Sequence, residues 1–247
     1  MASLTVENYV KTIHQIAARE AGTDGRSVVS TGQIAKEMGV SPGTVTGMIK
    51  TLTEAGLTTH TPYEGVRLTE PGLRLALKVI RRHRLLETFL VRTLNMPWDE
   101  VHEEAEHMEH AVSDRLIDRL DDYLNLPVVD PHGDPIPRAD GTVPAVLGYP
   151  LKDMVALNSF RVVRVIDQDP KFLRYLTDCG VILGAMGKVI ENRPEAGAVL
   201  FEIDGKRQML GQEAAGRVIV DLVPAATKKT SSVIKIRLQG EPDPRSH

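Results

Sequence analysis

The sequence has almost no cysteine, no long apolar run and no strong net charge, and each absence limits what the protein can be. Its only cysteine, Cys179, cannot form a disulfide within the chain and fits a reducing cytoplasm. No run approaches the roughly 18 apolar residues of a membrane span, and the N-terminus lacks a signal pattern. A formal net charge of −3 does not indicate a nucleic-acid partner. The composition therefore predicts a cytoplasmic globular protein of one large or several small domains, without a membrane partner.

What the sequence does contain is a dense run of histidine and glutamate over residues 101–110, Val-His-Glu-Glu-Ala-Glu-His-Met-Glu-His. With about 100° per residue on a helix, Glu106, Glu109 and His110 lie at about 40°, −20° and 80° from His102. These four side chains therefore share one helix face. The other polar residues of the run are expected to face solvent: Glu103, Glu104 and His107.

A second pair, His83 and Glu87, has the i, i+4 spacing of one helix face. Two helices that each present imidazole and carboxylate can close around a divalent metal. A solvated helix face is the plainer alternative, because charged surface helices are common. However, apolar residues surround both groups, which indicates packed helices whose polar side chains need partners. We therefore interpret the two groups as a metal-sensing site.

The first 73 residues carry the pattern of a winged helix-turn-helix domain. The sequence predicts an amphipathic helix at residues 6–16, a capped short helix at residues 30–39, a tight turn at residues 40–43 and another helix at residues 44–55. Residues 57–68 then predict a hairpin with turn chemistry at Pro62-Tyr63-Glu64-Gly65. This order of elements is typical of a DNA-binding winged helix.

In this arrangement residues 41–50 would enter the major groove and the hairpin would reach the backbone or the minor groove. The candidate DNA-binding residues are Ser41, Pro42, Gly43, Thr44, Thr46, Gly47 and Lys50, with His60, Tyr63 and Arg67 on the hairpin. Acidic residues slightly outnumber basic ones over residues 1–73, so the electrostatic footprint of DNA binding is missing. Small helix-turn-helix units also mediate protein contacts, and this alternative stays open.

The remaining sequence predicts a helical region, a connector and a small barrel. Residues 74–126 carry two apolar stripes, starting at Leu73 and at Val112, that are either ordinary core or a dimer seam. Residues 127–157 are rich in Pro, Gly and Asp and predict an extended connector. Residues 158–240 predict short strands around one helix at residues 171–179, with a last strand at residues 233–238. The predicted fold class is mainly α with a C-terminal β-barrel.

Taken together, these features resemble the diphtheria toxin repressor and manganese transport regulator family. The resemblance spans residues 4–223 and rests most on Ser41-Pro-Gly-Thr-Val-Thr, on Arg82-His83-Arg-Leu-Leu-Glu87 and on the stretch from His102 to Ser113. It implies a winged helix-turn-helix domain, a helical dimerisation and metal-binding domain and an SH3-like, FeoA-like barrel. It also implies a metal-activated transcriptional repressor rather than an enzyme. The partners would be a second copy of the chain and a palindromic DNA operator of metal-uptake genes.

The resemblance also assigns metal ligands. It places a primary site on Glu106, Glu109 and His110, completed from the first helix by Asn8. The neighbouring Glu7, or the backbone, could substitute for Asn8. It places an ancillary site on His83, Glu87 and His102, completed from the barrel by Asp169 or, as the second choice, by Asp167.

Three positions depart from parts of the family. Iron-responsive members carry a cysteine at the position of Glu106, whereas manganese-type members carry a carboxylate there. Because hard oxygen ligands suit Mn(II), the resemblance implies Mn(II) as the cofactor, with Fe(II) as the alternative. Asn8 replaces a Met or Asp and offers an uncharged carbonyl oxygen. Gly47 stands where some members carry a base-reading glutamine, so the operator sequence cannot be carried over.

Two other classes of protein share parts of this pattern. His102-Glu103 begins like the motif of zinc metalloproteases, but Glu106 stands where that motif has its second histidine. A metal-independent helical dimer that acts as a protein-interaction adaptor is the other class. A metal-insensitive oligomeric state without DNA affinity would distinguish it.

Overall fold

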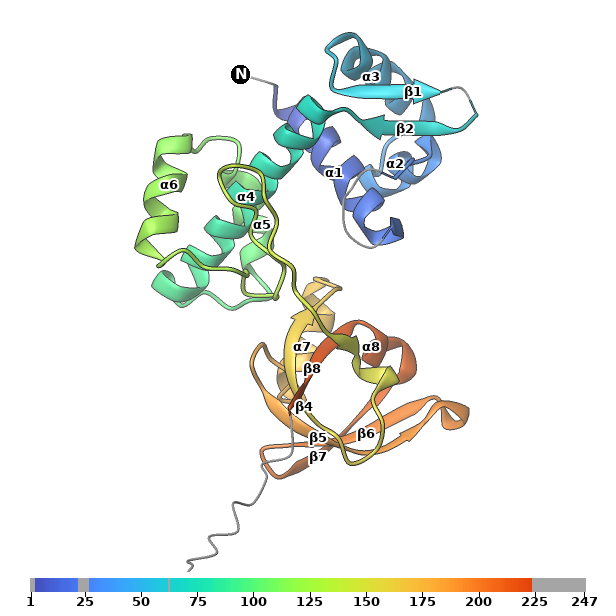
Figure 1. Ribbon diagram of the computed structural model, residues 1–247, viewed down its shortest axis with the longest axis vertical. Helices are drawn as coiled ribbons and strands as arrows, with labels where there is room; N and C mark the ends of the chain where they lie inside the picture. Colours follow the sequence, from blue (N-terminus) through green and yellow to red (C-terminus); the bar gives the residue numbers. More distant parts are fainter. Residues whose placement is uncertain (1–2, 22–26, 62, 224–247) are drawn as a thin grey trace, which may run out of the picture.

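In the computed structural model the chain forms three parts that follow one another in sequence (Figure 1). The structure describes residues 3–21, 27–61 and 63–223. Buried apolar side chains form three separate clusters, one in each part, so each part has its own core. Within the described residues, no helix is long and apolar enough to cross a membrane.

The first part is the predicted winged helix. It contains α1 (Leu4–Ala21), α2 (Thr31–Met38), α3 (Pro42–Glu54) and the hairpin of β1 (Thr58–Thr61) and β2 (Gly65–Leu68). The Ser30 hydroxyl caps α2, and Gly39 ends it at a φ of 64°. The turn predicted at residues 40–43 is partly wrong, because α3 already begins at Pro42 with Ser41 as its cap. Proline is tolerated there because the first helical N–H has no partner within the helix. Pro62, predicted in the hairpin turn, lies outside the described residues.

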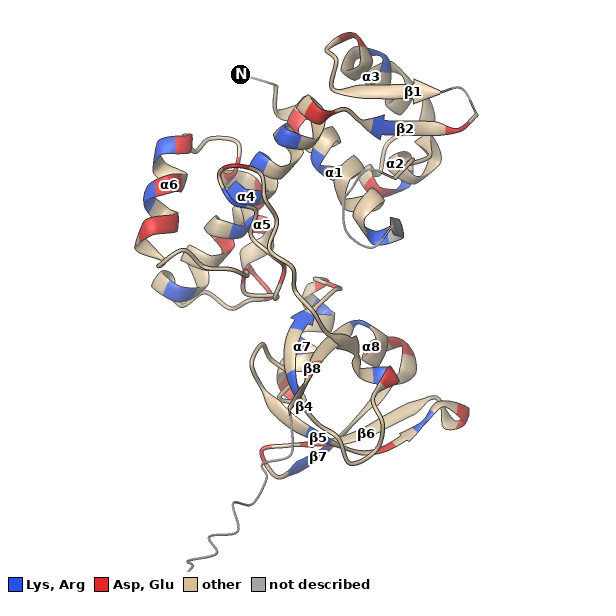
Figure 2. Ribbon diagram, viewed as in Figure 1, with Lys and Arg blue, Asp and Glu red and all other residues tan. Residues whose placement is uncertain are grey.

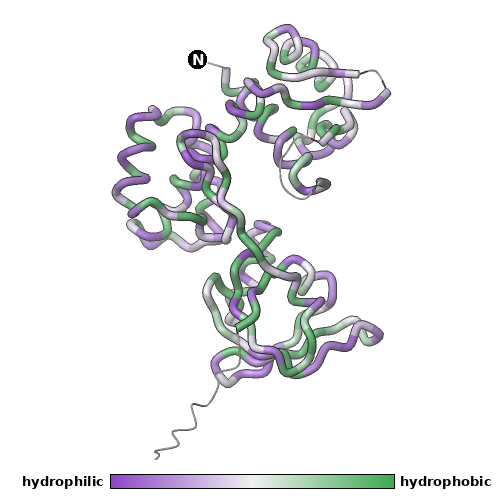
Figure 3. Tube along the Cα trace, in the orientation of Figure 1, coloured by the Kyte–Doolittle hydropathy of each residue, from purple (hydrophilic) through white to green (hydrophobic). Residues whose placement is uncertain are grey.

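The second part is built on the long helix α4 (Glu70–Leu94), against which α5 (Val101–Met108) and α6 (Asp114–Tyr123) pack. The apolar stripe of α4 is core, since Leu77, Ile80 and Leu86 are buried. In contrast, α6 is mostly hydrophilic (Figure 3) and leaves Leu116 exposed. Helix α1 of the first part also packs along α4, so side chains from α1, α4 and α5 can meet.

The segment after α6 is more than a connector. Asp130, His132, Asp134 and Ile136 are buried, and Val129 pairs with Pro135 in an isolated bridge. Arg84 of α4 donates a hydrogen bond to the carbonyl of Pro135. The prediction of an extended connector is therefore wrong for residues 130–136, which pack against α4.

The third part is a six-stranded antiparallel sheet in the order β3-β8-β4-β5-β6-β7. Its elements are β3 (Tyr149–Pro150), η1 (Leu151–Asp153), β4 (Ser159–Val165), α7 (Pro170–Asp178), β5 (Met186–Arg193), η2 (Pro194–Ala196), β6 (Ala198–Ile203), β7 (Lys206–Gly211), α8 (Gln212–Gly216) and β8 (Val218–Val223). The sequence did not predict β3, β7 or α8. Asp204 and Gly205 form the turn between β6 and β7, both with positive φ. The strand predicted at residues 233–238 lies outside the described residues.

Candidate metal centre

Three helices bring the predicted ligands together. Helix α4 presents His83 and Glu87 one turn apart, and both side chains are buried. Helix α5 presents His102 and Glu106, and its buried Ala105 packs with apolar residues of α4. This packing fixes which face of α5 turns towards the ligands of α4.

Two of the predicted ligands lie just beyond α5 instead of on it. The helix ends at Met108, and Glu109 is its C-cap, with its N–H still bonded to the carbonyl of Ala105 at 2.9 Å. His110 follows in a turn. Both side chains nevertheless face inward, because Glu109 is fully buried and His110 nearly so. The flanking residues predicted to face solvent are exposed: Glu103, Glu104 and His107.

His83 joins the two predicted ligand sets. Its Nδ1 lies 2.6 Å from Glu109 Oε2, and its Nε2 lies 3.0 Å from Glu87 Oε1 and 3.1 Å from His102 Nδ1. His102 Nε2 lies 3.8 Å from Glu106 Oε1. Ligand atoms of His83, His102 and Glu106 all lie within 4.8 Å of one another. The primary and ancillary sets assigned by the resemblance are therefore parts of one continuous cluster.

Helix α1 reaches this cluster through Glu7. Glu7 Oε2 lies 2.7 Å from His110 Nδ1, and His110 Nε2 lies 3.2 Å from Glu109 Oε1. The neighbouring Asn8 differs: its Oδ1 is buried and has no hydrogen-bond partner among the described residues. Both residues of α1 thus remain candidate metal ligands. Glu7 contacts the cluster, and Asn8 has a buried oxygen without a partner.

The electrostatics of the cluster follow from burial and pairing. Burial lowers the pKa of His83, but the carboxylates of Glu87 and Glu109 outweigh it and raise this pKa to about 9. Burial raises the pKa of Glu87, yet the charge of His83 holds it below its ordinary value. Burial likewise opposes ionisation of Glu106, while the Lys11 ammonium lowers the pKa of that carboxyl. Glu87 and Glu106 are therefore anions near neutral pH, as metal ligands must be.

A lysine that the sequence analysis did not single out lies inside the cluster. Lys11 of α1 is buried, and its Nζ donates to Glu106 Oε1 at 2.7 Å and to both carboxylate oxygens of Glu109 at 2.9 and 2.8 Å. Its position in the sequence could have indicated this location. Lys11 lies one helical turn from Glu7 and next to the buried apolar residue Val10.

A second group of ligand atoms lies beside Glu87. Glu87, Asp130 and His132 are all buried, and one ligand atom from each lies within 4.8 Å of the others. His132 Nε2 donates to the carbonyl of Trp98 at 2.8 Å, which leaves its Nδ1 as an acceptor 3.8 Å from Glu87 Oε2. Burial, then the carboxylates of Asp134 and Glu87, raise the pKa of Asp130. The sequence analysis missed Asp130 and His132 because it assigned Asp-Pro-His-Gly-Asp to a connector.

These donors fit a divalent cation. Within the described part of the chain, several buried ligand-type atoms lack a hydrogen-bond partner: Asn8 Oδ1, Glu87 Oε2, His110 Nε2, Asp130 Oδ2 and His132 Nδ1. Buried lone pairs without partners destabilise a fold. Carboxylate, carbonyl and imidazole donors suit first-row divalent metals, so such a cation would satisfy them.

The predicted DNA-binding residues lie on an exposed face of α3 and at the wing. Ser41, Thr44, Thr46 and Lys50 are exposed. Ser41 is first of all a helix cap, since its Oγ accepts the N–H of Thr44, and Thr46 Oγ1 donates to the carbonyl of Pro42. The remaining predicted residues are exposed too: Pro42, Gly43, Gly47, Tyr63 and Arg67. Figure 2 shows Lys and Arg spread over all three parts instead of gathered on α3.

Comparisons with known proteins agree with this arrangement. The N-terminal DNA binding domain of iron dependent repressors matches residues 1–66, their metal binding and dimerisation domain matches residues 69–138, and a FeoA domain matches residues 149–222. The iron-dependent repressor IdeR of Mycobacterium leprae is 30% identical over 232 residues, which cover 89% of this chain and 97% of that protein. The chain belongs to the iron-dependent repressor family. It is therefore a metal-dependent transcriptional repressor and not an enzyme.

Solved structures similar to this repressor include manganese-dependent proteins. A manganese-dependent transcriptional repressor in complex with manganese is 42% identical, with a TM-score of 0.77, and the match covers 88% of this chain and 100% of that one. The manganese regulator SloR is 33% identical, with a TM-score of 0.69 and coverage of 88% and 98%. The diphtheria toxin repressor of Corynebacterium glutamicum is 28% identical over 230 residues, covering 89% of this chain and 96% of that protein.

The β part of the repressor does not bring its predicted ligands into the cluster. Asp169 caps α7 by accepting the N–H groups of Lys171 and Phe172, and Asp167 pairs with Arg217. Both carboxylates line a cleft of about 550 Å³ that His102 and Glu106 also line. The β part thus faces the ligand cluster across this cleft, with both aspartates engaged in local contacts.

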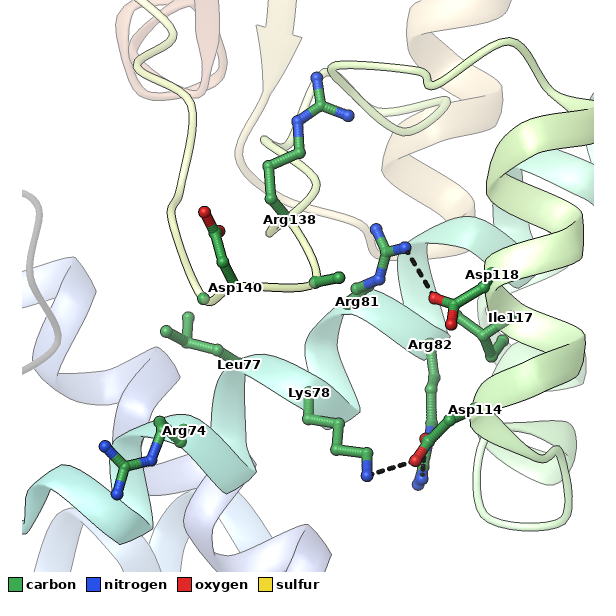
Figure 4. A pocket seen from close by; sticks show the side chains of 12 residues that line it. Arg74, Leu77, Lys78, Arg81, Arg82, Asp114, Ile117, Asp118, Arg138 and Asp140 are labelled. Atoms are coloured by element: carbon green, nitrogen blue, oxygen red, sulfur yellow. Dashed lines mark hydrogen bonds and ion pairs between the residues drawn. The ribbon is translucent and has the colours of Figure 1, made fainter.

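A separate pocket of about 320 Å³ lies between α4, α6 and residues 138–141 of the repressor. Figure 4 shows Lys78 and Arg82 approaching Asp114, while Arg81 approaches Asp118. Each of these three cationic side chains already pairs with an aspartate. The pocket therefore does not resemble a second group of candidate metal ligands. Arg82 Nη1 also lies 3.5 Å from Glu7 Oε1, which links this side of the pocket to the cluster of candidate ligands.

Proposed function

We propose that this repressor is activated by Mn(II) and that it binds, as a homodimer in the cytoplasm, a palindromic operator of metal-uptake genes. One observation carries the choice of metal: the candidate ligands are carboxylates, imidazoles and an amide oxygen. Cys179, the only cysteine, lies in the core cluster of the β part, away from these donors. Without a soft thiolate, the donor set favours a hard cation such as Mn(II) over metals that prefer sulfur. The likeness to a manganese-dependent repressor in complex with manganese supports the same choice.

The ligand cluster offers two positions for a cation. Glu106, Glu109 and His110, with Asn8 or Glu7 from α1, would hold one ion. A second would lie among His83, Glu87 and His102, with Asp130 and His132 as further donors on the far side of Glu87. The bound cation supplies the positive charge that these buried carboxylates otherwise obtain from neighbouring side chains. Asp167 and Asp169 would need to leave their present partners to contribute.

Helix α1 couples this cluster to DNA binding. It belongs to the core of the winged helix, yet Glu7 contacts His110, which follows α5 in the second part. Ligands on α1 and α5 that share one cation would hold the winged helix in a single orientation on the helical part. This lowers the ordering cost of placing α3 on DNA, which is how binding at one site can favour binding at another.

The homodimer is supported by apolar side chains that the second part leaves uncovered. Leu116, Tyr123, Leu126 and Val128 are exposed on or just after α6. Burying such residues against a second copy removes apolar area from water. A twofold dimer presents two α3 helices related by symmetry, and this symmetry predicts a palindromic operator.

Selection from a random-sequence DNA pool tests this function. The protein is incubated with the pool at fixed salt in the presence of Mn²⁺, Fe²⁺, Zn²⁺ or a chelator. We expect a palindrome to be enriched with metal only, and most strongly with Mn²⁺. Strongest enrichment with Fe²⁺ would support the iron-responsive alternative suggested by the names of several relatives. Equal enrichment with chelator would contradict metal activation.

A further inference from the structure

Lys11 places a positive charge at the centre of the ligand cluster. Its side chain is only 6% exposed, and its Nζ lies within 3 Å of three carboxylate oxygens, one of Glu106 and two of Glu109. It also lies 3.3 Å from His83 Nδ1. Lysine is seldom buried unless its charge is paired, and here two carboxylates pair with it. The ammonium therefore neutralises part of the charge that would otherwise attract a metal.

The same oxygens cannot serve both cations at once. A hard divalent cation binds carboxylate oxygens at about 2.0–2.6 Å, and it would bind the same oxygens that now accept the N–H groups of Lys11. An ammonium left in place would also lie within a few ångströms of the ion, where like charges repel strongly in a site of low dielectric. Lys11 therefore cannot keep its present position when a metal binds to Glu106 and Glu109.

We propose that the Lys11 ammonium is a tethered cation that occupies the Glu106–Glu109 position in the metal-free protein and competes there with the activating metal. This inference rests on the proposed function, because it assumes that the cluster binds a divalent cation. The competition lowers the apparent metal affinity and so sets the metal concentration at which the repressor responds.

The structure offers Lys11 a route out of the cluster. Gln15, one helical turn further along α1, lines the cleft of about 550 Å³ that Glu106 also lines. A lysine side chain has a flexible four-carbon stem, so its ammonium can swing from Glu106 into this cleft without unwinding α1. In the metal-free protein, Lys11 also ties α1 to α5 through Glu106 and to the C-cap of α5 through Glu109. Exchange of Lys11 for metal therefore replaces one link between the winged helix and the helical part with another.

The first test compares metal affinity between the wild type and Lys11→Met, measured by competition with a coloured chelator. Lys11→Met removes the charge and keeps the length of the side chain. We expect it to bind Mn²⁺ about tenfold more tightly, because no tethered cation has to be displaced. Lys188→Met, on an exposed position of β5, is the matched control and should leave the affinity unchanged. Lys11→Arg retains the charge and should not tighten binding. Unchanged or weaker binding by Lys11→Met would overturn the proposal.

The second test needs no substitution at Lys11, so it stands even if Lys11→Met fails to fold. The wild-type protein is treated briefly with an amine-acetylating reagent, with and without Mn²⁺, and Lys11 is quantified by mass spectrometry. We expect Lys11 to be protected without metal and to react about tenfold faster with it, whereas Lys188 reacts equally in both states. A rate at Lys11 that stays constant or falls on metal addition would overturn the proposal.

The outcomes separate this inference from the proposed function. Wild-type protein that binds Mn²⁺ while Lys11 stays protected would refute the tethered cation and leave the metal centre intact. Binding by Lys11→Met but not by the wild type would support the competition. If neither chain binds Mn²⁺, the metal centre is wrong and the tethered cation is wrong with it.

Discussion

Glu106 is the residue that we expect to decide the metal preference. Its carboxylate faces α1 and α4 at once, with Oε1 2.7 Å from Lys11 Nζ and 4.0 Å from His83 Nδ1. An oxygen donor at this point favours hard cations, whereas a thiolate would favour softer ones. The metal preference of the repressor should therefore respond to this one side chain.

Replacing Glu106 by cysteine should move the preference from Mn²⁺ towards Fe²⁺ or Zn²⁺, because a thiolate replaces a carboxylate among the ligands. The measurement is the metal concentration that half-saturates binding of the selected operator, taken for each metal. Glu104→Cys introduces the same thiol at an exposed position of α5 and should keep the wild-type order. An unchanged metal order in Glu106→Cys would refute the role given to Glu106.

The raised pKa of His83 predicts how the metal-free protein responds to pH. This pKa rises from 6.5 to about 9 on folding, so the folded state holds the proton more tightly than the unfolded chain. The resulting stability is present in full below pH 6.5 and is lost as the pH rises through 9. We expect the free energy of unfolding to fall by up to roughly 3 kcal/mol over this range, at about 1.4 kcal/mol per pKa unit.

Urea denaturation of the metal-free protein at a series of pH values measures this loss. His83→Gln should flatten the dependence between pH 6.5 and 9. His60→Gln, at an exposed position of β1, should leave it as in the wild type. Stability that stays level or increases over this range would contradict the assignment to His83.

At the scale of elements, α4 connects the wing to the ligand cluster. Its first turn packs against the end of the winged helix, where the carbonyl of Leu57 accepts the N–H of Thr69 at 3.0 Å. A Cβ at Gly72 would lie only 2.0 Å from that same carbonyl oxygen. Glycine is therefore needed where the backbone of α4 approaches the start of the hairpin.

Gly72→Ala should destabilise the protein by about 2 kcal/mol or more, because backbone must move to admit the methyl group. Gly47→Ala is the matched comparison, since a Cβ at Gly47 would meet no described atom within 4 Å. It should instead stabilise α3 by up to about 1 kcal/mol. Thermal and urea unfolding report both changes. A Gly72→Ala variant as stable as the wild type would refute the close approach.

The sequence predicts elements well where a local pattern decides them and poorly where a distant contact does. The cap at Ser30 and the left-handed Gly39 predict α2, and apolar periodicity predicts α1 and α4. The buried positions of Asp130 and His132 depend on packing against α4, which no local pattern encodes. Lys11 was missed for the same reason, since its partners lie 95 and 98 residues away in the sequence.

At the scale of the whole molecule, the cluster of candidate metal ligands lies where the winged helix meets the helical part. Glu7 and Lys11 belong to the first part, while Glu109 and His110 belong to the second. Most candidate ligands were predictable, because the spacing of His83 with Glu87 and of His102 with Glu106 places each pair on one helix face. That these two faces meet each other, and that α1 closes over them, follows only from the three-dimensional fold.

The measurement that tests the central claim most directly is the affinity of the repressor for its selected operator, with Mn²⁺ or with chelator, at one salt concentration. It is made on the wild type and on Glu109→Gln, which removes the charge of a fully buried candidate ligand. We expect the wild type to bind at least about tenfold more tightly with Mn²⁺, and Glu109→Gln to lose this difference. Equal wild-type affinity with Mn²⁺ and with chelator would contradict metal control of DNA binding by this cluster.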